Sequence, residues 1–252
     1  MPKRRRDKRA DHLVTVWLES VEIRGESFPD PTRYPFNIPP LQGRQTLSLA
    51  GSTSFLVGEN GSGKSTLLQA IARRCGVDMW AQPQPKLRPG ELSSAALSEH
   101  LRVSLRGGPM SAAFFSAEGF RAWAEFLDDV TEADPGQAKY QGCAELTHRS
   151  HGEGILAYMS GRYRVPGLYF LDEPETALSP SSQLELLRIL EEFRGAGHSQ
   201  FLIATHSPIL MALPESQIFH LAGSGISEID YESTDHFRLY RAFLEDPHSF
   251  LS

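Results

Sequence analysis

The segment FLVGENGSGKST, residues 55–66, gathers three glycines, one lysine and several hydroxyl side chains in a single short stretch. From Gly58 to Ser65 it satisfies the pattern G-x-x-x-x-G-K-[ST]. Glycines let backbone N–H groups wrap the oxygens of a phosphate chain, while Lys64 would reach the β- and γ-phosphates and Ser65 would ligate Mg²⁺. A chance match in a chain of this length has a probability on the order of 1%. The segment therefore predicts a triphosphate-binding loop made by Gly58, Glu59, Asn60, Gly61, Ser62, Gly63, Lys64, Ser65 and Thr66.

Two acidic residues follow an apolar run further along the chain. In LYFLDEPETALSP, residues 168–180, four mainly apolar residues lead directly to Asp172 and Glu173. Asp172 would hold the Mg²⁺ shell, and Glu173 would orient and polarise the attacking water. Alone, such a run could equally be a core strand that meets solvent. Downstream of a phosphate loop it predicts the acidic Walker B motif of nucleotide-hydrolysing enzymes.

A histidine ends a third apolar run, in FLIATHSPIL, residues 201–210. A lone histidine is more often structural than catalytic. The strand–helix–strand order, however, would place this run beside the Walker B strand in a parallel sheet, where ligands collect at the carboxyl ends of the strands. His206 is therefore a candidate to contact the γ-phosphate or the attacking water.

The elements that must position these residues follow from hydrophobic periodicity and turn residues. Alternating residues predict a strand within 13–25, and the Pro-rich stretch 28–40 predicts an irregular surface segment, because each proline fixes φ and removes a donor. Residues 233–247 predict a helix with Thr234 as N-cap, stopped by Pro247. The remaining predicted elements are buried strands at 53–57, 167–171 and 200–205 and helices at 64–75, 120–130 and 182–193.

Together the three motifs resemble the ATP-binding cassette (ABC-type) ATPases, over most of the chain from about Leu13 to Leu221. The resemblance implies an α/β P-loop NTPase with a mostly parallel central sheet, an N-terminal antiparallel β portion and a small helical subdomain. We expect a single ABC-type domain over 12–252, with the helical subdomain at about 119–165. The implied activity is hydrolysis of ATP with Mg²⁺, by an enzyme that forms a homodimer on ATP binding.

In this family a signature segment, usually LSGGQ, completes the nucleotide site of a second subunit in a head-to-tail dimer. The matching segment here is RSHGEG, in which Ser150 and Gly152 align with the family's serine and second glycine. Glu153 replaces the glutamine. The resemblance therefore implies that Ser150, Gly152 and Glu153 contact a nucleotide held by the partner, although Ser150 with Glu153 would also make an ordinary helix cap.

Other positions of the family pattern are less well matched. Where a glutamine near Mg²⁺ normally ends a strand, this chain offers Glu118, a candidate metal ligand that could instead only cap the next helix. The D-loop would be Ala177, Leu178 and Ser179. For stacking against adenine we expect one of two aromatic residues before the phosphate loop, Tyr34 or Phe36.

Within the family, the details favour a soluble ATPase over a transporter subunit. Transport ATPases usually read D-E-P-T after the strand, whereas this chain reads D-E-P-E at 172–175 and A-T-H-S-P at 204–208. This combination resembles stand-alone or nuclease-linked ATPases related to the OLD and RecF-like groups, often described as AAA-family ATPases. We therefore expect coupling to an unknown effector protein, in DNA maintenance or defence. A transporter ATP-binding subunit and a nucleotide sensor that hydrolyses poorly remain alternatives.

Charge is distributed unevenly along the chain. Residues 1–10 contain six lysines and arginines against Asp7, which leaves 19 basic and 30 acidic residues elsewhere. A basic arm can attract nucleic acid or an anionic membrane surface, but the acidic body would repel the same phosphates. We expect residues 1–11 to be a solvated, disordered tail, with nucleic-acid binding as the weaker alternative.

The cysteine content and the lack of a long apolar run indicate in which cellular compartment the protein works. Cys75 and Cys143 are the two cysteines, too few for a disulfide framework, which suits a reducing environment. No run approaches the roughly 18 consecutive apolar residues of a membrane span. The sequence therefore predicts a cytoplasmic protein without a membrane span.

Overall fold

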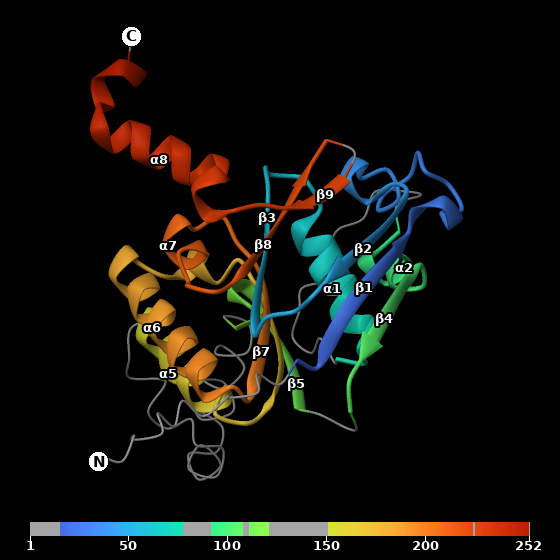
Figure 1. Ribbon diagram of the computed structural model, residues 1–252, viewed down its shortest axis with the longest axis horizontal. Coiled ribbons are helices and arrows are strands. Elements are labelled where there is room, and N and C mark those ends of the chain that lie inside the picture. The colour runs from blue at the N-terminus through green and yellow to red at the C-terminus, as the bar shows by residue number, and fades with distance from the viewer. Residues whose placement is uncertain (1–15, 78–91, 108–110, 121–150, 224, 252) are drawn as a thin grey trace, which may run out of the picture.

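A six-stranded sheet forms the centre of the computed structural model, which describes residues 16–77, 92–107, 111–120, 151–223 and 225–251 (Figure 1). The strand order is β5-β6-β7-β3-β8-β9, and all neighbouring pairs are parallel except β8 with β9. Parallel strands place their carboxyl ends at one edge, so β3, β6 and β7 deliver their loops to the same place. The bounds are β3 (Thr53–Val57), β5 (Ser111–Ser116), β6 (Gly167–Asp172), β7 (Ser199–Ala204), β8 (Gln217–Ala222) and β9 (Gly225–Glu228).

A second, antiparallel sheet lies beside the first. Its order is β2-β1-β4, with β1 (Leu18–Arg24) between β2 (Arg44–Ser48) and β4 (Leu101–Leu105). The buried side chain of Gln200 on β7 ties the two sheets together, because its Oε1 accepts hydrogen bonds from the backbone N–H groups of Trp17 and Leu18, each at 2.8 Å. The predicted fold class, with its antiparallel N-terminal portion, is confirmed.

Helices cover both faces of the central sheet. Strand residues alternate between the faces, so that Leu56 packs with α1 while its neighbours Phe55 and Val57 pack with α5 and α6. The helix that begins in the phosphate loop and the helix that begins in the signature segment therefore lie on opposite faces. The helices bounded within the described ranges are α1 (Lys64–Arg74), α2 (Ser94–Ser98), α5 (His151–Arg162), α6 (Pro180–Ala196), α7 (Pro208–Met211) and α8 (Asp235–Glu245).

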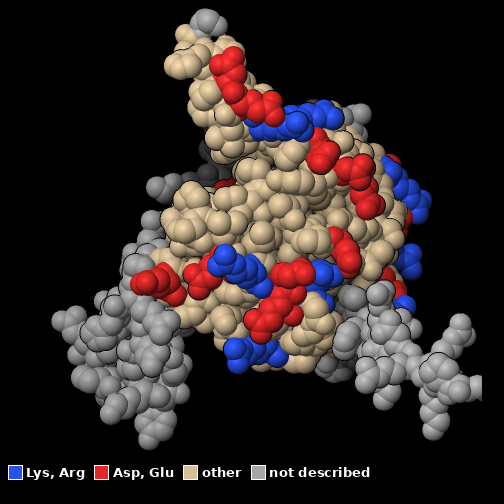
Figure 2. All heavy atoms as spheres, turned by 60° about the vertical axis from the view of Figure 1, so that its left-hand side comes forward, with Lys and Arg blue, Asp and Glu red and all other residues tan. Residues whose placement is uncertain are grey.

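The C-terminal helix α8 projects from the body, at the upper left of Figure 1. Thr234 caps it as predicted, since its side chain accepts a hydrogen bond from the N–H of Phe237 at 3.2 Å. No residue of α8 is buried, and Leu239 and Leu244 are exposed. Figure 2 shows a wide uncharged surface below this helix, and an apolar groove of about 920 Å³ runs between α6, α7 and α8.

One prediction about the N-terminal region is corrected. The Pro-rich segment 28–40 is irregular, as predicted, but it is not a surface segment throughout. Phe36 and Ile38 are 1% and 6% exposed, and Ile38 lies against the phosphate loop at Gly63. Prolines interrupt regular structure without preventing the apolar residues between them from entering the core.

Short 3₁₀ turns occupy Gly25–Ser27, Pro39–Leu41, Pro174–Ala177, Tyr231–Ser233 and Pro247–Phe250.

Several predictions fall outside the described residues: the tail 1–11, the helix at 120–130 apart from its first residue, and most of the helical subdomain. Of that subdomain, the structure describes α5, whose residues Ile155 and Met159 are fully buried in the core shared with α6. Among the helices of the described ranges, none is long and apolar enough to cross a membrane.

Candidate functional site

The phosphate loop joins β3 to α1, and its two outer glycines are required by geometry. Gly58 has φ 146°, and a Cβ there would lie 2.5 Å from the carbonyl oxygen of Leu221. Gly63 has φ 94°, and a Cβ there would lie 2.7 Å from Ile38. These positions exclude larger side chains for steric reasons, so the loop can turn tightly and bring backbone N–H groups to the start of α1.

Lys64 folds back across this loop. Its side chain is buried, and Nζ donates hydrogen bonds to the carbonyl oxygens of Gly58 at 3.0 Å and Glu59 at 3.1 Å. Burial lowers the pKa of the ammonium group, while the nearby carboxylates of Glu173 and Asp172 act in the opposite direction. The cation is thus held on the inner side of the loop, opposite the Walker B carboxylates.

Asp172 ends β6 as a buried carboxyl group, 8% exposed. Burial raises its pKa to about 6, and a hydrogen bond from Ser65 opposes that rise. The Nε2 atom of Gln69 lies 3.5 Å from Oδ2, whereas Oδ1 is buried and has no hydrogen-bond partner among the described residues. A buried, unpartnered carboxylate oxygen beside a serine hydroxyl fits Mg²⁺, which proteins bind through one or two carboxylates together with substrate phosphates.

The described residues contain no cluster of three or more His, Cys, Asp or Glu that could hold a metal by itself. Glu118, the other proposed metal ligand, is exposed, two residues beyond the end of β5. Its role as a ligand stays a prediction.

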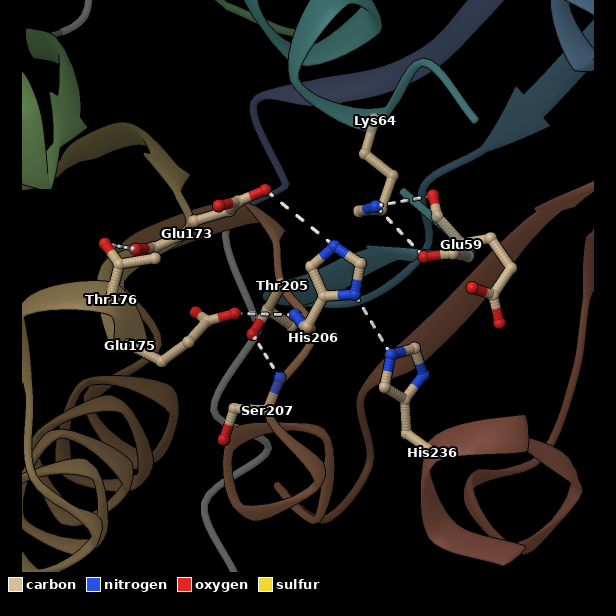
Figure 3. A network of polar contacts seen from close by, with 10 residues as sticks. Glu59, Lys64, Glu173, Glu175, Thr176, Thr205, His206, Ser207 and His236 are labelled. Atoms are coloured by element: carbon tan, nitrogen blue, oxygen red, sulfur yellow. Dashed lines mark hydrogen bonds and ion pairs between the residues drawn. The ribbon is translucent and has the colours of Figure 1, made fainter. Parts of the chain in front are cut away.

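Glu173 and His206 approach each other because β6 and β7 are parallel neighbours, with Asp172 opposite Ala204 in the register. The His206 Nε2 atom lies 3.8 Å from Glu173 Oε1 and is buried without a hydrogen-bond partner in the described part of the chain. Glu173 adopts a left-handed backbone with φ 45°, which is uncommon for a residue other than glycine and belongs to the strained conformations that cluster at functional sites. Figure 3 shows both side chains facing Lys64.

Two further contacts to His206 were not anticipated from the sequence. Its backbone N–H donates to Glu175 Oε1 at 2.6 Å, so the second glutamate of D-E-P-E holds the backbone that carries the histidine. Its Nδ1 lies 3.0 Å from Nε2 of His236, which belongs to α8 (Figure 3). Burial is the largest cause lowering the pKa of both imidazoles. No sequence signal links His206, in the loop after β7, to a residue of α8 that lies 30 positions later.

The signature segment lies at the start of α5. Ser150 is outside the described residues, but Gly152 and the exposed Glu153 are described. A Cβ at Gly152 would lie 3.6 Å from the carbonyl oxygen of Ala177 and 3.8 Å from Leu178. The described part of the signature segment, at Gly152, therefore sits beside the D-loop, on the face of the sheet opposite to α1.

The two candidates for adenine stacking differ in the structure. Phe36 is 1% exposed and packs against Phe28, with ring centroids 4.8 Å apart, so the prediction that it could stack on a nucleotide is wrong. The apolar core takes up its ring. Tyr34 is partly buried, and its hydroxyl lies 3.0 Å from Oγ1 of Thr66 at the start of α1. Tyr34 remains the candidate.

Comparisons with known proteins identify relatives of this chain. The chain is 34% identical over 173 residues to the thiamine import ATP-binding protein ThiQ of Cereibacter sphaeroides, covering 63% of this chain and 72% of the relative. It is 30% identical over 190 residues to the cytochrome c biogenesis ATP-binding export protein CcmA of Agrobacterium fabrum, covering 69% and 84%. Residues 147–212 match the family described as "AAA domain, putative AbiEii toxin, Type IV TA system".

The fold is shared as well. The structure of cbiO1 from Clostridium perfringens, part of the ABC transporter complex cbiONQ, superimposes with a TM-score of 0.53 at 14% identity, covering 92% of this chain and 97% of that one. The chain belongs to the ABC-type P-loop ATPases. It is an ATPase, and its cofactors are ATP and Mg²⁺.

Proposed function

We propose that this chain is a soluble, cytoplasmic Mg²⁺-dependent ATPase that closes as a head-to-tail homodimer around two ATP molecules and transmits the closure to a partner protein. The observation that carries the proposal is the position of Gly152, beside the D-loop and across the sheet from α1. A signature segment on that face is separated from its own phosphate loop. It is therefore available to a nucleotide held by a second copy.

In the proposed reaction each residue at the sheet edge has one task. Ser65 and Asp172 would hold Mg²⁺, which neutralises charge on the phosphates. Lys64 would exchange its contacts with loop carbonyls for the β- and γ-phosphates. Glu173 would accept a hydrogen bond from the attacking water, and His206 would direct Nε2 at the γ-phosphate side of the site.

The alternative is an ATP-binding subunit of a transporter. The names of two relatives favour this alternative, because they refer to thiamine import and to cytochrome c biogenesis export. Glu175 favours a different effector. Transport ATPases usually have threonine at this position, whereas here the Glu175 carboxylate accepts a hydrogen bond from the backbone N–H of His206. Co-purification of the tagged chain with an integral membrane protein would decide for the transporter.

The test uses Glu173→Gln, which keeps the side-chain shape but removes the charge. It should bind Mg²⁺-ATP with normal affinity and lose most turnover, by a factor on the order of 10² or more. With hydrolysis blocked, light scattering after size exclusion should show a shift from monomer to dimer when ATP is added.

A second substitution tests the interface itself. Adding Gly152→Arg to Glu173→Gln should prevent the ATP-dependent dimer by steric block. Gly161→Arg is the matched control on the same helix, because a Cβ at Gly161 meets nothing within 4 Å in the described part of the chain. Normal turnover by Glu173→Gln would remove Glu173 from catalysis, and a Glu173→Gln protein that binds ATP yet stays monomeric at high concentration would refute the dimer.

A further inference from the structure

The first turn of α8 brings a second histidine against His206. The ring centroids of His206 and His236 are 5.2 Å apart, and the atoms that face each other are Nδ1 of His206 and Nε2 of His236, at 3.0 Å. This is hydrogen-bond distance, so one of the two nitrogens carries the shared hydrogen. Figure 3 shows that Nδ1 points to α8 while Nε2 points to Glu173.

Burial disfavours the charged form of both imidazole rings. Burial lowers the pKa of each imidazole, and the charged groups that face the pair are Lys64, Glu59 and Glu173, with Asp235 and His220 beside His236. A neutral imidazole has one donor and one acceptor nitrogen. Hence, if His236 donates to Nδ1 of His206, the hydrogen of His206 must be on Nε2.

We propose that His236 is a positioning residue for ATP hydrolysis: it donates its Nε2–H to Nδ1 of His206 and thereby holds His206 in the tautomer whose Nε2–H faces the phosphate side of the site. The inference rests on the role proposed above for His206. The tautomer matters because only an Nε2–H can donate to the oxygens of a γ-phosphate, and the hydrogen bond at one ring nitrogen decides which tautomer is present.

The first turn of α8, which carries His236, is anchored to the body of the protein. Thr234 is 1% exposed and caps the helix, and Tyr231, just before it, donates a hydrogen bond from its hydroxyl to the carbonyl oxygen of Pro208 at 2.9 Å. The ring of Phe237 packs on Tyr231 with centroids 4.7 Å apart. Hydrolysis is thereby linked to the seating of the C-terminal helix, a segment outside the three family motifs.

The experiment compares two substitutions of the same residue. His236→Phe keeps a ring but has no donor, whereas the amide of His236→Gln can still donate from a similar position. We expect His236→Phe to lower kcat by a factor on the order of ten, the effect of one positioning hydrogen bond, with the affinity for a fluorescent ATP analogue unchanged. His236→Gln should recover most of the loss. His248→Phe is the control, because His248 is exposed beyond the end of α8.

The tautomer is measured directly on protein with ¹⁵N-labelled histidine, from two-bond ¹H–¹⁵N spectra assigned with His206→Gln. Wild-type His206 should carry its hydrogen on Nε2, and His236→Phe should shift it toward a mixture of tautomers. A wild-type hydrogen on Nδ1, or equal losses of kcat in the Phe and Gln variants, would overturn the proposal. If His236→Phe does not fold, His236→Asn, too short to reach Nδ1, takes its place with the same expected loss. Normal hydrolysis by His206→Gln would instead count against the proposed role of His206.

Discussion

Replacing Asp172 by asparagine should stabilise the nucleotide-free protein while abolishing its response to Mg²⁺-ATP. Asp172 is 8% exposed, and burial raises its pKa to about 6 from an ordinary value of 3.8. Since one pKa unit corresponds to 1.36 kcal/mol, holding this carboxylate ionised in the fold costs about 3 kcal/mol at pH 7. Asparagine has nearly the same shape and cannot ionise, and it keeps an acceptor oxygen for Gln69.

The pH dependence gives the sign of this effect. The folded pKa, about 6, lies above the ordinary value of 3.8, so the carboxyl group costs nothing below about pH 3, where it is protonated in both states. The cost develops as the pH rises from about 4 to 6 and is nearly complete at pH 7. The stability advantage of Asp172→Asn should therefore be absent at about pH 3, small at pH 4 and up to about 3 kcal/mol at pH 7, which is large against a typical total of about 5–15 kcal/mol.

Urea unfolding in EDTA, followed by tryptophan fluorescence at a series of pH values, measures the difference. Repeating it with Mg²⁺ and ATP at about 100 times the dissociation constant should stabilise the wild type by about 2.7 kcal/mol and leave the variant unchanged. The reasoning is refuted if Asp172→Asn is less stable than the wild type at pH 7, or if the difference does not depend on pH.

Three other substitutions test the fold and the loop. Lys64→Ala should abolish ATP binding or turnover in a folded protein, because it removes the flexible cation of a cradle otherwise made of backbone; unchanged affinity and hydrolysis would contradict the assignment. Gly58→Ala should reduce ATP affinity at least about tenfold in a titration, since its Cβ would lie 2.5 Å from the Leu221 carbonyl oxygen; wild-type affinity would show that the loop adapts. Gln200→Leu should lower the free energy of unfolding by about 3 kcal/mol, because it leaves buried backbone groups of Leu18 unpaired; a loss under about 1 kcal/mol in urea would show that water replaces the amide.

Long-range packing corrected or extended the sequence prediction at particular residues. Phe36 looked available to a nucleotide because it lies among prolines, yet the core takes its ring, with 1% of its surface exposed. Gln200 looked like a polar residue at the start of a buried strand, but it bridges two sheets through backbone groups more than 180 positions earlier. Neither contact can be recognised from a periodic or local pattern in the sequence, because each depends on which surfaces meet when the two sheets pack.

The sequence by itself determined the phosphate loop, the strand end at Asp172 and Glu173, and the strand that carries His206. These features are local: a glycine pattern, an apolar run and a following polar residue specify the backbone within a dozen positions. Tertiary structure alone decided that Asp172 Oδ1 is buried without a partner among the described residues, that Gly152 lies across the sheet from α1, and that His236 reaches His206. Each of these features joins segments that are distant in the chain. Hydrophobic packing brings such segments together, and no local sequence pattern specifies which residues then meet.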